Sequence, residues 1–110
     1  MTKQSSSPVA ERSSSPLGQA WTYHVQGKDD LAIAEFNKLL EQRPDDIDTL
    51  YGLALSQKSA GQSQAALENF QRVLDLLARV DVSMEDAANR VTIMSRMVNQ
   101  QIVALQETLG

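Results

Sequence analysis

Cysteine is absent from this chain of 110 residues, and histidine occurs only once, as His24. Without cysteine the fold has no disulfide, and no thiolate is available as a nucleophile or a metal ligand. A single histidine also excludes a metal site built from several imidazoles. Aromatic residues make up only 5% of the chain, so leucine, alanine, valine, isoleucine and methionine must supply most of the core. The low numbers of glycine (5) and proline (3) argue against a fold of many short strands.

Acidic side chains outnumber basic ones, so that the net charge is −4. Proteins that bind nucleic acid normally present a basic face, so we expect no nucleic acid as partner. No run approaches the roughly 20 apolar residues that a membrane-spanning helix requires, and residues 1–15 lack the apolar segment of a secretory signal. We therefore expect no membrane partner and a cytoplasmic location, which fits the absence of cysteine.

Catalytic motifs are missing as well. The chain has no glycine-rich phosphate loop, no paired-histidine motif and no nucleophile elbow. His24 stands close in sequence to Asp29 and Asp30, but a lone histidine at a helix end is usually inert. The acidic run 45–48 lacks the glycine and the distal glutamate of a calcium loop. We expect no enzyme activity, no cofactor, no metal and no small-molecule substrate.

What the sequence does contain is a series of helices separated by helix-ending residues. Residues 1–15 are rich in serine and proline and are predicted to form a disordered tail. The first helix is predicted to begin at Pro16 after the capping residue Ser15, and to end at Gly27. The predicted domain covers residues 16–110.

Three further helices follow from the same signals. The second runs to Pro44, the third begins after the capping residue Asp46 and ends at Gly61, and Ser63 is expected to cap the fourth. The last helix is predicted over residues 84–108, since that stretch contains neither glycine nor proline. The fold class is therefore all-α, with five helices.

The chain also repeats itself at an offset of 34 residues. The matching pairs are Gly27 with Gly61, Ala32 with Ala66, Phe36 with Phe70, Leu40 with Leu74, Leu50 with Met84, and Ala54 with Ala88. A period of 34 residues that contains two helices is typical of one class of helical repeat protein.

These residues resemble the tetratricopeptide repeat (TPR). Repeat one (13–46) matches the family pattern at Tyr23, Ala32, Phe36 and Pro44, and repeat two (47–80) matches at Leu50, Leu53, Ala54, Ala66 and Phe70. The last helix matches only the first-helix half, through Met84, Ala87, Ala88 and Val91. The chain departs from the pattern at Pro16, Gln19, Gln57 and Ala78. The resemblance implies antiparallel helix-turn-helix repeats stacked as a TPR-like α-solenoid, with the long last helix as a C-terminal cap.

The resemblance also implies a binding face, because the first helix of each repeat lines the concave side in this family. The predicted peptide-binding residues are Leu17, Trp21, His24, Tyr51, Leu55 and Lys58, and Glu85, Asn89 and Thr92 would extend the face onto the last helix. A carboxylate clamp known in one subclass is missing, since its positions hold Leu17, Trp21 and Gly52. The alternative is that the tail or a neighbouring chain covers this face.

The last helix carries a long apolar stripe with a spacing of three or four residues. Its second half, from Val98 onward, is expected to find no helix in this chain to cover it. The predicted interface for a partner or a second copy consists of Ile93, Met97, Val98, Ile102, Leu105 and Leu109. The alternative is a helix that folds back as two segments and packs within the domain.

Two functions remain open at this point. The first is a non-catalytic adaptor or assembly module that binds a peptide or helix of a partner protein. The second is a structural module that forms a homodimer through its C-terminal helix.

Overall fold

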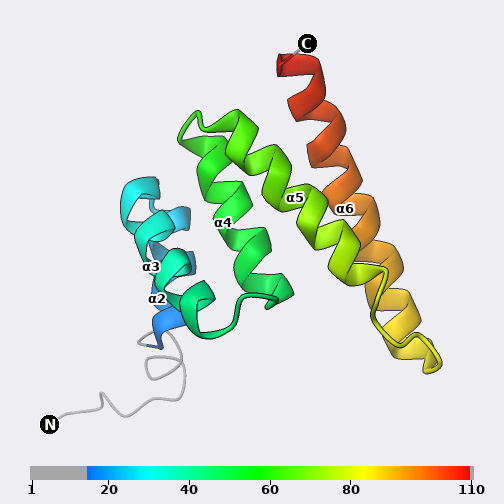
Figure 1. Cartoon of the computed structure of the whole chain (residues 1–110). Coiled ribbons are helices and arrows are strands. Elements are labelled where there is room, and N and C mark those ends of the chain that lie inside the picture. The colour runs from blue at the N-terminus through cyan, green and yellow to red at the C-terminus, as the bar shows by residue number, and fades with distance from the viewer. Residues whose placement is uncertain (1–14, 110) are drawn as a thin grey trace, which may run out of the picture.

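The computed structural model describes residues 15–109, which form the helices α2 to α6 (Figure 1). Their bounds are Pro16–Val25 (α2), Asp29–Gln42 (α3), Ile47–Ser59 (α4), Ser63–Leu77 (α5) and Glu85–Leu109 (α6). The five predicted helices are thereby confirmed, and α6 is one continuous helix rather than two segments. The predicted tail lies outside the described residues, except for Ser15.

Local signals explain where most of these helices begin and end. Ser15 caps α2 by accepting a hydrogen bond from the Gly18 amide at 3.0 Å, and Asp46 caps α4 through the Thr49 amide at 3.1 Å. Gly27 and Gly61 have φ angles of 78° and 82°, a conformation that side chains with a Cβ disfavour.

The predicted cap at Ser63 is wrong. Gln62 stands at the capping position of α5 without a side-chain hydrogen bond, and Ser63 is the first helical residue. The serine lies one position too late in the chain to accept from the free amides of the first turn.

The helices are stacked in chain order. Each of them packs against the next, α2 also touches α4, and α6 packs on α5, with a side-chain hydrogen bond to it from Lys58 of α4. In Figure 1 the pairs α2–α3 and α4–α5 lie side by side, and α6 forms the edge farthest from α2. This arrangement is the all-α repeat fold that the 34-residue period predicted.

Two phenylalanines at equivalent repeat positions anchor the core. Phe36 and Phe70 are both fully buried, and burial of such a side chain contributes roughly 1.5–3 kcal/mol. Phe36 packs in a first cluster with Ala20, Ala32 and Leu53. Phe70 belongs to a larger cluster that joins α4, α5 and α6 and contains Leu50, Ala54, Ala66, Leu67, Val73, Leu77, Val98, Ile102 and Leu105.

Two polar contacts also join parts of the fold. Asn69 donates a hydrogen bond to the buried Gln57 at 2.8 Å, which explains how this departure from the family pattern is accommodated. Arg72 of α5 donates to Asp45 at 2.6 Å and ties α5 to the loop before α4.

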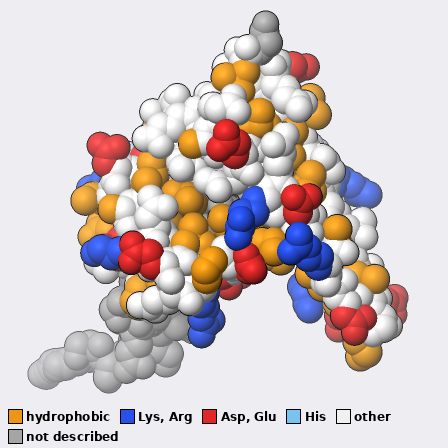
Figure 2. All heavy atoms as spheres, viewed as in Figure 1, with side chains coloured by type: hydrophobic (Ala, Val, Ile, Leu, Met, Phe, Trp, Pro, Cys, Tyr) orange, Lys and Arg blue, Asp and Glu red, His pale blue; other side chains and the backbone are white. Residues whose placement is uncertain are grey.

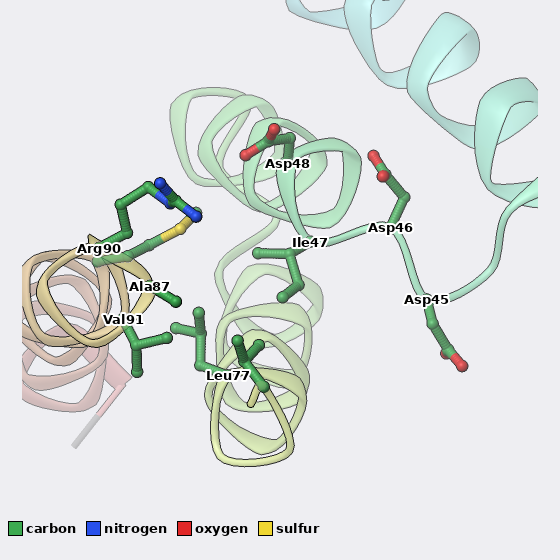
Figure 3. Close-up of a pocket in the computed structure, with 10 residues that line it drawn as sticks. Asp45, Asp46, Ile47, Asp48, Leu77, Ala87, Arg90 and Val91 are labelled. Atoms are coloured by element: carbon green, nitrogen blue, oxygen red, sulfur yellow. The ribbon is translucent and has the colours of Figure 1, made fainter. Parts of the chain in front are cut away.

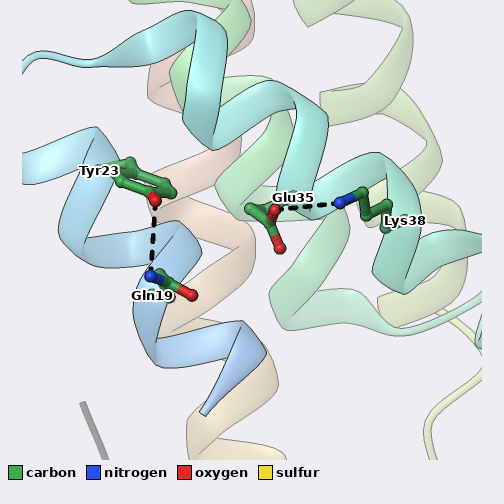
Figure 4. Close-up of polar contacts among 4 residues, drawn as sticks. All are labelled: Gln19, Tyr23, Glu35 and Lys38. Carbon is green, nitrogen blue, oxygen red and sulfur yellow. Dashed lines mark hydrogen bonds and ion pairs between the residues drawn. The ribbon is translucent and has the colours of Figure 1, made fainter. Parts of the chain in front are cut away.

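The surface view in Figure 2 shows acidic and basic side chains next to each other among hydrophobic ones, without a large area of one charge. Figure 4 shows two contacts of the first repeat, Gln19 with Tyr23 and Lys38 with Glu35, both 3.4 Å long. Exposed contacts of this kind contribute little to stability.

Candidate protein-interaction site

The second repeat presents a row of side chains along one face of α4. Asp48, Tyr51, Leu55 and Lys58 follow one another at intervals of three or four residues, so they share that face. Tyr51 and Leu55 are half-buried and pack against the core, whereas Asp48 and Lys58 are exposed. The row therefore has an apolar middle between two charged ends.

Aromatic rings connect this row to α2. The Trp21 ring lies 6.5 Å from the Tyr51 ring and 5.4 Å from the Phe36 ring, and Tyr51 in turn packs edge-on against Phe70 at 5.9 Å. His24 continues the series at 6.1 Å from Trp21. Edge-to-face pairs at these distances add stability beyond the burial of area. Trp21, His24 and Tyr51 are thus brought together, as neighbouring and partly accessible rings.

Gly52 makes this aromatic arrangement possible. A Cβ atom at Gly52 would collide with the Phe36 ring, and it would lie 3.0 Å from Cζ2 of Trp21. Since real Cβ atoms essentially never come as close to another atom as this one would to the Phe36 ring, only glycine lets that ring reach the α4 backbone, with Trp21 beside it. Sequence reasoning had used this position only to reject the carboxylate clamp.

The polar atoms of His24 and Tyr51 differ in their surroundings. The His24 Nδ1 atom lies 3.3 Å from a carboxylate oxygen of Asp29, across the turn between α2 and α3. Burial raises the pKa of the Tyr51 phenol above 10.0. The hydroxyl is therefore protonated at neutral pH and available as a hydrogen-bond donor.

The other two predicted residues lie at the margins of the aromatic group. Lys58 donates a hydrogen bond to Gln101 of α6 at 2.6 Å, which closes one end of the space between α4 and α6. Leu17 packs beside the first core cluster and lines a hollow of about 290 Å³ together with Leu39, Gln42, Arg43, Asp46, Asp48 and Thr49.

At the Asp48 end of the row lies a cleft that sequence reasoning missed. The cleft measures about 440 Å³ and is bounded by the start of α4, the end of α5 and the first half of α6 (Figure 3). Its apolar lining consists of Ile47, Leu77, Val80, Ala87, Val91 and Met94, and Asp45, Asp46, Asp48 and Arg90 form its polar part. Figure 3 shows the Arg90 side chain extending from α6 toward Asp48 on α4.

The extension of the binding face onto α6 stays a prediction. Glu85, Asn89 and Thr92 are exposed and do not line the cleft, which Arg90 and Met94 line instead. The 34-residue register would place α6 beside α4 in the way that α4 lies beside α2, but α6 packs on α5 without a comparable helix contact to α4.

Two charged residues explain this difference. Asp86 and Arg90 occupy the positions that correspond to Gly52 and Ser56, which are buried in α4. Burial of an unpaired charge costs several kcal/mol. Since burial of Asp86 or Arg90 would carry this cost, both side chains stay exposed and α6 does not approach α4 in the way that α4 approaches α2.

The expectation that the second half of α6 lacks a covering helix is wrong. Val98, Ile102 and Leu105 are 0%, 7% and 2% exposed and belong to the same core cluster as Phe70 of α5. These three residues are therefore unavailable to a partner. Ile93, Met97 and Leu109 are exposed, as are Met84 and Val103, and their role in an interface stays a prediction.

Within residues 15–109, no three histidine or acidic side chains are grouped closely enough to hold a metal ion. No helix of that part is both long and apolar enough to cross a membrane.

Comparison with known proteins agrees with this architecture. A tetratricopeptide repeat model matches residues 17–46 and 48–76, which together make up more than half of the chain. The matches cover the two helix pairs and leave out α6. No curated protein and no solved structure gives a significant match. The chain belongs to the tetratricopeptide repeat family, whose repeats mediate protein–protein interaction or scaffolding.

Proposed function

We propose that this chain is a non-catalytic adaptor that binds a peptide or a helix of a partner protein along α4. The observation that carries this proposal is the continuity of the surface. A half-buried aromatic and aliphatic row leads directly into the cleft of about 440 Å³ beside Asp48. Peptide-binding sites combine apolar pockets with a few placed polar groups in this way.

The lining of the cleft defines the chemistry of the ligand. An apolar side chain of the partner would fill the space between Ile47, Leu77 and Met94. Asp48 and Arg90 offer one charge of each sign at the cleft. The ligand would thus combine a large apolar residue with flanking polar groups that pair with this acid and this base.

We propose no nucleic-acid partner, because the net charge is negative. We propose no small-molecule substrate, because the site holds no arrangement of catalytic side chains. We also propose a cytoplasmic location, because a chain without cysteine fits a reducing compartment.

A displayed peptide library selected on the immobilised protein tests this function. Selected peptides are then titrated against the protein in solution, with Trp21 as the reporter, because it is the only tryptophan of the chain. We expect enriched peptides with a recurrent large apolar residue, and a changed Trp21 emission upon binding.

Three variants locate the site. Tyr51→Ala and Arg90→Glu should each weaken binding at least about tenfold, which corresponds to roughly 1.4 kcal/mol. Leu31→Ala, which alters an exposed leucine of α3 away from the row, should bind normally. A selection without enrichment, or peptides that bind all three variants equally well, would refute the proposed site.

A second function, self-association through α6, is favoured by the exposed Ile93, Met97 and Val103 on that helix.

A further inference from the structure

The outward face of α6 carries an isolated pair of opposite charges. Arg96 and Glu107 are the only charged side chains between positions 91 and 109. They stand eleven residues apart, which is close to three helical turns, so they project from the same side of α6. Both are exposed, and within residues 15–109 no ion pair between them or with another charged residue explains their placement.

A shallow hollow of about 460 Å³ lies between these charges. It is lined by Arg96, Asn99, Gln100, Val103, Ala104 and Glu107. Val103 is 54% exposed at its centre, whereas the opposite face of α6 is buried on α5. Since α6 is the outermost helix (Figure 1), no described helix covers this hollow.

The order of these six residues is self-complementary. When a second α6 is laid antiparallel across the first, with the two-fold axis midway between residues 101 and 102, each lining residue meets another one. Arg96 faces Glu107 of the second copy, Asn99 faces its Ala104, and Gln100 faces its Val103. Two-fold symmetry then repeats every pair, so one charge pair on the helix becomes two intermolecular ion pairs.

The charges also select the direction of the helices. A parallel arrangement in the same register would place Arg96 beside Arg96 and Glu107 beside Glu107, which is repulsive. The antiparallel arrangement has no like charges opposite each other. The small Ala104 opposite Asn99 permits the close approach of roughly 8–10 Å that packed helices need between their axes.

We propose that two copies of this chain form an antiparallel dimer through this face of α6. The dimer does not depend on the peptide site, because none of its six residues lines the cleft between α4 and α6. It also differs from the interface expected from the sequence, since Val98, Ile102 and Leu105 are core residues of each protomer.

Light scattering over a hundredfold concentration range at low salt measures the absolute mass in solution and thereby tests this dimer. We expect a rise toward twice the chain mass of 12.1 kDa. Arg96→Glu and Glu107→Arg should each weaken the dimer at least about tenfold, because each change turns two attractive pairs into repulsive ones. Combining both changes in one chain should restore the dimer, since the pairs are then attractive with their signs exchanged.

A matched control is Arg79→Glu, which makes the same change of charge at an exposed residue that does not line the hollow. This variant should dimerise like the unaltered chain. A chain that stays monomeric at every concentration would overturn the proposal. So would a dimer that resists both single reversals, or a double reversal that fails to restore it.

The absence of cysteine allows a direct test of the register. Under mild oxidation, a mixture of the single variants Asn99→Cys and Ala104→Cys should yield a covalent heterodimer. Each variant alone should cross-link poorly, because equivalent positions do not face each other in this pairing. Equal cross-linking of the mixture and of either single variant would refute the register. Dimers broken by Ile93→Asp but unaffected by Arg96→Glu would instead locate the interface elsewhere on α6.

Discussion

Lys58 of α4 and Gln101 of α6 are joined by a hydrogen bond of 2.6 Å, in which the lysine Nζ atom donates to the amide oxygen. The two helices do not pack directly on each other, and both rest on α5. Gln101 immediately precedes Ile102, which is buried in the core shared with α5. Of these two adjacent residues of α6, Gln101 therefore belongs to the surface and Ile102 to the core.

This contrast predicts unequal effects of two neighbouring substitutions. Ile102→Ala should lower the free energy of unfolding by about 2–5 kcal/mol, because it leaves a cavity in the core. Gln101→Ala should lower it by less than about 1 kcal/mol, because Lys58 is exposed and water replaces the lost hydrogen bond. Urea denaturation at a concentration where the chain is monomeric measures both. An unchanged stability of Ile102→Ala would mean that α6 does not pack on α5 as described.

Gly52→Ala should destabilise the protein although alanine is the better helix former. The added Cβ would lie 2.6 Å from Cε1 of the buried Phe36, and such overpacking costs about 1–3 kcal/mol. The gain in helix propensity, about 0.8–1.0 kcal/mol, does not offset this cost. In a Phe36→Leu background the penalty should shrink, and a double-mutant cycle by thermal denaturation measures the coupling. Additive effects would contradict the predicted collision.

Ser56→Ala should stabilise the protein. The Ser56 hydroxyl is fully buried and has no hydrogen-bond partner within the described part of the chain. Removal of such a group avoids a desolvation cost of about 1–3 kcal/mol. The opposite result is expected for Gln57→Ala, which leaves Asn69 without its acceptor. Urea titrations of the two variants compare them directly, and a destabilised Ser56→Ala would show that the hydroxyl is satisfied.

Alkaline pH should weaken the fold through Tyr51. Its pKa is raised above 10.0 by burial in the folded protein, so the unfolded chain loses this proton first as the pH rises. The stabilisation is fully present below pH 10.0 and is lost as the pH rises through the folded-state value. Thermal melts between pH 9 and 12 should show a smaller loss for Tyr51→Phe than for the unaltered chain. Identical pH profiles would show that Tyr51 does not contribute.

Much of the fold was predictable because it depends on local signals. Pro16, Pro44, Gly27 and Gly61 mark helix ends through backbone geometry alone. The equivalence of Phe36 and Phe70 follows from a sequence comparison at a fixed offset. The predicted aromatic residues Trp21 and Tyr51 also lie together, because the repeat register places them on facing helices.

The cleft beside Asp48 was not predictable in the same way. It arises because α6 leaves room between Met94 and Ile47, and that spacing depends on how α6 packs on α5 without approaching α4. The sequence signal was present in Asp86 and Arg90, whose charges do not fit the buried positions that Gly52 and Ser56 occupy one repeat earlier.

By itself the sequence determined the helices, their period and the residues that share each helical face, because these properties depend on backbone geometry and on spacing along the chain. Only the tertiary structure decided which face of α6 is buried. The row through Val98 and Ile102 and the row through Ile93 and Met97 are both apolar. The first row is buried because it packs on the apolar side of α5 around Phe70 and Val73, and the second stays exposed because no described helix lies beside it.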